Sequence, residues 1–115
     1  MKSIAFIECI GKNGNRYFRS FLADRLDGKW QPLHATEENP FAGMNNVTDD
    51  AGGKPWTRDI SHGAILRDGN DETLTIDPEH LTFLYQGLDQ STPTDLDYSQ
   101  LPYKLALLRQ DIAAK

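Results

Sequence analysis

The sequence has a single cysteine, no apolar run long enough to span a bilayer, and no cluster of basic side chains. Cys9 alone cannot form an internal disulfide, and no cysteine and histidine pattern has the spacing of a zinc site. The formal net charge is -5 and the basic residues are scattered, which argues against a nucleic-acid or membrane partner. The chain runs from Met1-Lys2-Ser3 directly into an apolar segment, so no signal peptide is recognised here.

The composition is that of one small folded domain. The chain has 115 residues, of which 38% are hydrophobic, and it contains two Trp, four Tyr and five Phe. This aromatic content distinguishes it from sequences that stay disordered for want of apolar surface to bury. A chain of this length has room for one domain at most.

Short segments rich in β-branched and aromatic residues alternate with turn signals along the chain. Asn13-Gly14 separates the first two segments and predicts a hairpin. The predicted strands are 4–10, 16–22, a short one around Trp30 that ends at Pro32, 64–67, 73–76 and 81–87. Between them, residues 34–55 are expected to form a long loop, and 90–97 a shorter one. The pattern predicts an all-β fold of antiparallel meanders, as in a sandwich, a barrel or part of a propeller.

The segment after Leu101 fits two patterns. Leu101, Leu105, Leu108 and Ile112 have helical spacing, yet residues 101–105 also suit a strand. We expect a strand to about Leu108, followed by a frayed or helical end.

Glu8 is a lone carboxylate within the otherwise apolar first strand. Because side chains alternate along a strand, it falls on the same face as Ile4, Phe6 and Ile10. Loss of hydration beside such neighbours penalises the charged form and keeps a proton available for donation near neutral pH. The alternatives are that this face is solvated or that an arginine pairs with the acid.

Three loop residues are candidates for chemistry, and each has an ordinary structural alternative. His62 lies among polar residues and glycine, where a histidine usually serves as a hydrogen-bonding structural group. Asp59 could orient that imidazole or cap a turn. Tyr98 could offer its ring to the C–H face of a sugar, or pack as a minor core contact.

Several blocks of the sequence, in order, resemble glycoside hydrolase family 62. Residues 7–11 followed by 16–20 resemble the family segment VEAIG…RYFRS, and 26–30 resemble its LDGxW turn. The later matching blocks are Asn39-Pro40-Phe41-Ala42-Gly43, 56–63, Thr75-Ile76-Asp77-Pro78, Leu84-Tyr85-Gln86-Gly87, Asp97-Tyr98 and Leu101-Pro102-Tyr103. The likeness covers nearly the whole chain.

The resemblance implies a function and a fold. Members of the family are secreted α-L-arabinofuranosidases that remove arabinose side groups from arabinoxylan with inversion, on a five-bladed β-propeller. By this resemblance Glu8 is the general acid, His62 contacts a central calcium ion that is otherwise held largely by water, and Tyr98 lines the sugar site. The implied partners are arabinoxylan or xylo-oligosaccharides, and the implied location is extracellular.

The chain also departs from the family pattern. An inverting glycosidase needs a second carboxylate about 6.5–9.5 Å from the acid to activate water. In the family this base lies upstream of the matched blocks. Ala64, Ser99 and Glu79 stand where the family has Glu, Asn and a disulfide-forming cysteine. Residues 1–108 are thus interpreted as a C-terminal fragment, about the last two blades, with 109–115 as a tail.

Such a fragment is predicted to be inactive alone because it carries the acid without the base. A non-catalytic carbohydrate-binding remnant and an unrelated small all-β protein are the alternatives. Blades cut from a ring also expose apolar surface. We expect Trp30, Trp56, Phe83 and Tyr85 to be unshielded and the thermal transition to be broad.

Overall fold

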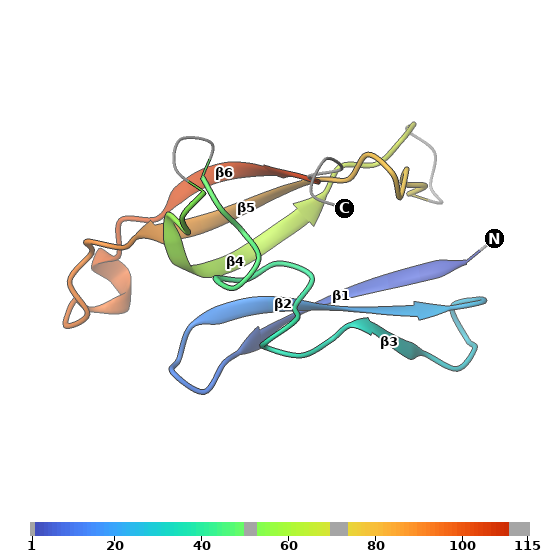
Figure 1. Ribbon diagram of the computed structural model, residues 1–115, viewed down its shortest axis with the longest axis horizontal. Helices are drawn as coiled ribbons and strands as arrows, with labels where there is room; N and C mark the ends of the chain where they lie inside the picture. The colour runs from blue at the N-terminus through green and yellow to red at the C-terminus, as the bar shows by residue number, and fades with distance from the viewer. Residues whose placement is uncertain (1, 50–52, 70–73, 111–115) are drawn as a thin grey trace.

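The computed structural model describes residues 2–49, 53–69 and 74–110, which form two antiparallel sheets of three strands each (Figure 1). The first sheet contains β1 (Ser3–Ile10), β2 (Arg16–Ala23) and β3 (Gln31–His34), and the second contains β4 (Thr57–Ile65), β5 (Thr82–Asp89) and β6 (Lys104–Arg109). A short 3-10 helix, η1 (Tyr98–Gln100), precedes β6. The predicted all-β class and its antiparallel meanders are confirmed. Within the described residues, no helix is long and apolar enough to cross a membrane.

The hairpin of β1 and β2 forms as the Asn13-Gly14 signal predicts. Gly14 has φ 81° and donates its N–H to the carbonyl of Gly11 over 2.9 Å. That positive φ suits glycine, which lacks the Cβ that would clash there. The register places Glu8 opposite Phe18. The turn therefore fixes which β2 residues lie beside the acid.

The third strand is displaced from its predicted position. It was expected around Trp30 and to end at Pro32, but β3 begins at Gln31 and continues to His34. Proline, which has no N–H to donate, is tolerated here because β3 is the edge of its sheet. Residues 35–49 belong to the predicted loop and form no strand, and residues 53–56 lead into β4.

Two predictions for the second half are wrong. The strand expected at 64–67 is the end of a longer one: β4 covers Thr57–Ile65, and Leu66 and Arg67 lie beyond it. Residues 74–76 form no strand, because Leu74 has φ 55°, which extended backbone does not adopt. Thr73, also in that prediction, lies outside the described residues.

The ambiguous tail is a strand, as expected. β6 pairs with β5 in antiparallel register, with Leu108 opposite Phe83 and Leu107 opposite Leu84. This pairing satisfies the backbone and buries alternate side chains, which a helix with the same leucine spacing would not do at this sheet edge. Residues 111–115, for which a frayed or helical end was predicted, lie outside the described part.

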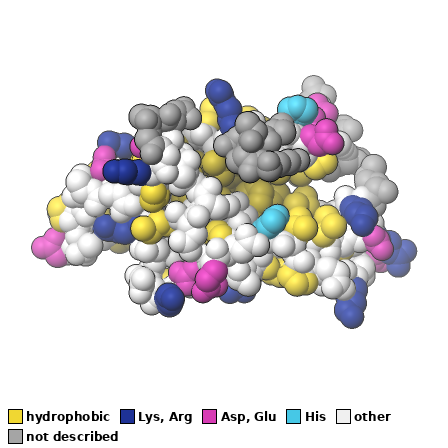
Figure 2. Space-filling view, viewed as in Figure 1, with side chains coloured by type: hydrophobic (Ala, Val, Ile, Leu, Met, Phe, Trp, Pro, Cys, Tyr) yellow, Lys and Arg dark blue, Asp and Glu magenta, His cyan; other side chains and the backbone are white. Residues whose placement is uncertain are grey.

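The core lies between the two sheets and centres on Phe83 of β5. Its ring centroid is 5.0 Å from that of Phe18 on β2, 5.4 Å from Phe41 and 6.2 Å from Phe6 on β1. One aromatic side chain of the second sheet thus meets three from the first sheet and its following loop. In Figure 2, hydrophobic side chains show around the middle of the molecule, and charged ones of both signs are spread around its outline.

The expected exposure of the four aromatic residues is therefore wrong. Phe83 and Tyr85 are each only 2% exposed, and Trp30 and Trp56 are half-buried. The reason is that the two sheets cover each other's inner faces. The large apolar side chains that remain exposed on β5 and β6 are aliphatic: Leu84, Leu105 and Leu107.

Candidate active site

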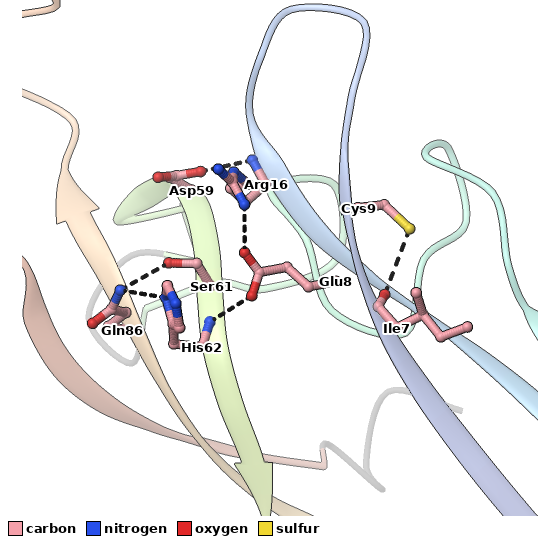
Figure 3. A network of polar contacts seen from close by, with 8 residues as sticks. All are labelled: Ile7, Glu8, Cys9, Arg16, Asp59, Ser61, His62 and Gln86. Carbon is pink, nitrogen blue, oxygen red and sulfur yellow. Dashed lines mark hydrogen bonds and ion pairs between the residues drawn. The ribbon is translucent and has the colours of Figure 1, made fainter. Parts of the chain in front are cut away.

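The Glu8 carboxylate lies where β1 faces the edge of β4 (Figure 3). One oxygen, Oε2, accepts a hydrogen bond from Nη1 of Arg16 over 2.8 Å. The other, Oε1, accepts the backbone N–H of His62 over 2.9 Å. The acid is therefore bonded to both sheets, with 21% of its side chain exposed.

The apolar surroundings expected for Glu8 are not what the structure shows. Its two bonded partners are a guanidinium and a backbone N–H, and Ile10, on the same face, is 63% exposed. The alternative in which an arginine pairs with the acid is confirmed. Because both partners are donors, this arrangement suits the ionised carboxylate, which accepts at both oxygens.

His62 is exposed on β4 and has φ 48°, a left-handed conformation that is uncommon for residues other than glycine. Its ring Nδ1 lies 2.8 Å from Nε2 of Gln86 on the neighbouring strand β5. The same Gln86 atom lies 3.3 Å from the hydroxyl of Ser61, a side chain that is almost fully buried. The imidazole is therefore held by the side-chain amide of Gln86, which sequence analysis did not select.

Asp59 serves neither of the roles considered for it. Its Oδ1 accepts the backbone N–H of Arg16 over 2.6 Å, a bond from β4 to the start of β2. This bond orients Arg16, whose side chain in turn contacts Glu8. Asp59 thus acts on the acid through Arg16, and the polar contact of the His62 ring is with Gln86.

Tyr98 lies on η1 with 67% of its surface exposed, as a residue at the rim of a site would be. Its ring packs edge-on against Tyr103, with 6.4 Å between the centroids. Burial raises the pKa of the Tyr103 hydroxyl, and the negative charge of Asp59 acts in the same direction, with a smaller effect from Glu8. Tyr103 therefore contacts Tyr98 and is also affected by the charges of Asp59 and Glu8, a role that sequence analysis did not select.

The residues around His62 supply few ligands for a cation. Within the described ranges, no group of three or more His, Cys, Asp or Glu side chains is placed to hold a metal ion. The Gln86 amide contacts Nδ1, so Nε2 is available for coordination only when that amide turns its carbonyl toward an Nδ1–H. Calcium takes six to eight oxygen ligands. His62 consequently fits such an ion as one exposed ligand only, with water supplying most of the others.

A hollow of ≈ 270 Å³ lies beside Arg16, and neither Glu8, His62 nor Tyr98 contributes to its wall. Arg16 and Tyr17 of β2, Arg58 of β4, and Met44 and Asn45 of the long loop form part of its wall. Its lining is mostly charged groups and amides, which can bond hydroxyl-rich ligands.

Solved structures share this fold. The chain matches the catalytic domain of a Coprinopsis cinerea family 62 α-L-arabinofuranosidase with a TM-score of 0.84 and 48% identity, over 95% of this chain and 33% of that one. It matches the Podospora anserina α-L-arabinofuranosidase PaAbf62A, solved with cellotriose, with a TM-score of 0.83 and 47% identity, over 94% and 33%. A family 62 hydrolase solved with xylotriose gives 0.80 and 47%, over 93% and 32%. The fold is thus that of part of a glycoside hydrolase catalytic domain.

The sequence comparisons identify the family. The model of glycosyl hydrolase family 62 matches residues 1–109, so this chain belongs to that family. It is 52% identical to α-L-arabinofuranosidase C of Cellvibrio japonicus (strain Ueda107) over 97 residues, which are 84% of this chain and 15% of that protein. The chain spans about a third of the solved catalytic domains, which in this family are five-bladed propellers.

Proposed function

We propose that this chain is the acid-bearing part of an α-L-arabinofuranosidase, which hydrolyses arabinofuranosyl side groups of arabinoxylan with inversion. In this proposal Glu8 protonates the leaving xylosyl oxygen. Residues 1–108 correspond to the last two or so blades of the propeller, and 109–115 to a tail. The substrate is extracellular arabinoxylan or a xylo-oligosaccharide derived from it.

The observation that carries the proposal is the position of Glu8 at the meeting point of both sheets. Family membership rests on nearly the whole chain, and the motif that contains Glu8 lies within the matched residues. Around it the structure gathers Arg16, His62 and, through Arg16, Asp59. A carboxylate held from two sheets has the fixed orientation that proton transfer to a bound substrate requires.

Proton donation requires a change at this site. With both oxygens accepting hydrogen bonds, Glu8 is set up as a carboxylate, and protonation would place an O–H against Arg16 or the His62 N–H. One of these two hydrogen bonds must therefore lengthen or break when Glu8 is protonated. The proposed mechanism also needs a water-activating carboxylate on the opposite face of the sugar. In the family this base comes from sequence outside the blocks matched here.

The purified chain is therefore expected to release no arabinose from wheat arabinoxylan, because the acid acts alone. Ion chromatography of the reducing sugars after prolonged incubation would measure this, with a family 62 enzyme as the positive control. Arabinose released in proportion to chain concentration, and abolished by Glu8→Gln, would show that these residues supply the base as well.

We assign His62 as a calcium ligand in the complete site. The support is its exposed ring, whose Nε2 is left open by the contact of Nδ1 with Gln86. Metal-binding histidines typically bond through the other ring nitrogen to an oxygen acceptor, and the Gln86 amide can present one when its carbonyl faces the ring. The ion would supply positive charge to the floor of the sugar site.

A second candidate function is carbohydrate binding without catalysis. It is favoured by the exposed Tyr98 ring, braced edge-on by Tyr103. The related structures solved with xylotriose and cellotriose support a preference for β-1,4-linked chains.

Titration of the chain with xylotriose should perturb the resonances of Tyr98 if this surface binds sugar. Tyr98→Ala should weaken binding about 5- to 13-fold, the loss of one aromatic contact of about 1–1.5 kcal/mol. Leu26→Ala removes a side chain that is even more exposed, at the turn after β2, and should leave the titration unchanged. Equal effects of both changes would contradict a site at Tyr98.

A further inference from the structure

Strand β4 is interrupted twice in its pairing with β5. Its register shifts once between Thr57 and Ile60, and again between Ser61 and Ala64. Such bulges turn backbone and side-chain groups away from the ladder and often redirect them toward a functional site. In β4 the residues inside these two irregularities are Arg58-Asp59 and His62-Gly63.

The second bulge redirects a backbone N–H. His62 adopts φ 48° there, and its N–H leaves the sheet and meets Oε1 of Glu8 at 2.9 Å. A bond between a carboxylate and an N–H is charge-assisted and stronger than one between neutral groups. The strained conformation of His62 is therefore coupled to the placement of the acid.

The following glycine allows this bulge. A Cβ at Gly63 would lie 2.0 Å from Cζ of Phe83, so only glycine lets the backbone come this close to the central ring of the core. The bulge is thus held by the close packing of Gly63 on Phe83 and by the hydrogen bond from His62 to Glu8.

The first bulge acts on the partner of the acid. Asp59, inside it, accepts the backbone N–H of Arg16 over 2.6 Å, and the Arg16 side chain donates to Oε2 of Glu8 over 2.8 Å. Each bulge therefore reaches across from β4 to the hairpin of β1 and β2, and each governs one oxygen of the same carboxylate (Figure 3).

We propose that the paired bulges of β4 are a positioning device for Glu8, with His62 acting through its backbone N–H and Asp59 acting through Arg16. The imidazole of His62 is not needed for this role, which separates it from metal binding. The inference rests on the proposed function only in calling Glu8 the acid. The geometry itself can be tested in the isolated chain.

The test is the scalar coupling across the hydrogen bond between the His62 amide nitrogen and the Glu8 carboxylate carbon, measured by NMR in the labelled chain. We expect it in the wild type and in His62→Gly, because glycine keeps the N–H and accepts a positive φ. It should vanish in Glu8→Ala, and it should weaken in His62→Val, because a β-branched residue resists this conformation. Asp59→Ala should also weaken it, by releasing Arg16.

Leu74→Val is the matched control, because Leu74 also has a positive φ, 55°, but lies outside β4 and its two bulges. It should lower the Tm much as His62→Val does, yet leave the coupling intact. Absence of the coupling in the wild type would overturn the proposal, as would its survival at full strength in both His62→Val and Asp59→Ala. If His62→Val does not fold, the coupling measured in the wild type, His62→Gly and Asp59→Ala still tests the proposal. These outcomes are independent of arabinose release, which tests the proposed function.

Discussion

Replacing Phe83 with alanine is expected to lower the free energy of unfolding by about 3–5 kcal/mol, the usual loss for a large aromatic side chain in a core. Phe83 is 2% exposed and its ring meets those of Phe6, Phe18 and Phe41. Through these rings Phe83 joins β5 to the first sheet and its following loop. The whole free energy of unfolding of a domain is about 5–15 kcal/mol, so this loss is a large fraction of it and the variant should unfold at a much lower urea concentration.

Urea denaturation followed by tryptophan fluorescence and circular dichroism would measure the change. Leu84→Ala is the control, because Leu84 is the next residue of β5 and points to the outer face, where it is 37% exposed. It should cost far less than Phe83→Ala. Similar losses for the two variants would mean that the sheets do not pack through Phe83 as described.

Glu8→Gln should reduce hydrolysis of arabinoxylan by about 10²–10⁴-fold, the range over which a general acid contributes. Since the isolated chain is expected to be inactive, the change is made in a hybrid. In this hybrid, residues 1–109 replace the matching segment of α-L-arabinofuranosidase C of Cellvibrio japonicus, which is 52% identical over 97 residues. Glutamine retains the size of the side chain and one oxygen acceptor, but it cannot deliver a proton.

The control for this substitution is Glu79→Gln in the same hybrid. Glu79 is exposed, and its backbone N–H, not its side chain, bonds Asp77. It should retain full activity and an unchanged Tm. An equal loss of activity in both variants would point to instability of the hybrid and not to an acid at position 8.

Local signals predicted the first half of the fold well. The Asn13-Gly14 turn and the alternating residues beside it define the β1–β2 hairpin, and the observed register follows from that turn. The tail was also predicted as a strand, although its leucine spacing suited a helix, and the pairing with β5 decides in favour of the strand. In the hairpin the local signal and the long-range pairing agree, whereas in the tail the pairing decides between two local patterns.

The errors occur where tertiary contacts override the local pattern. The segment from Thr57 to Gly63 is mostly polar and contains a glycine, a pattern that predicts a loop. It is nevertheless most of β4, because its bulges place polar groups against the first sheet. Leu74 lies in a β-rich run, yet its left-handed backbone excludes a strand. Neither feature leaves a periodic signal in the sequence.

In the candidate site too, some residues were predicted from the sequence and others were missed. Glu8, His62 and Tyr98 were selected from the sequence, and the structure places the first two in direct contact and the third beside Tyr103. Arg16, Gln86 and Tyr103 were missed because each lies on a different strand or segment from its partner. For Arg16, an available signal was its place right after the hairpin turn, eight residues from Glu8.

The most direct measurement compares two substrates in the hybrid carrying Glu8→Gln. A 4-nitrophenyl arabinofuranoside has a leaving group that departs without protonation, whereas the xylosyl oxygen of arabinoxylan needs a proton. If Glu8 is the proton donor, kcat/KM should fall about 10²–10⁴-fold for arabinoxylan and by less than about 10-fold for the nitrophenyl substrate. Equal losses on both substrates would contradict the assignment of Glu8 as the general acid.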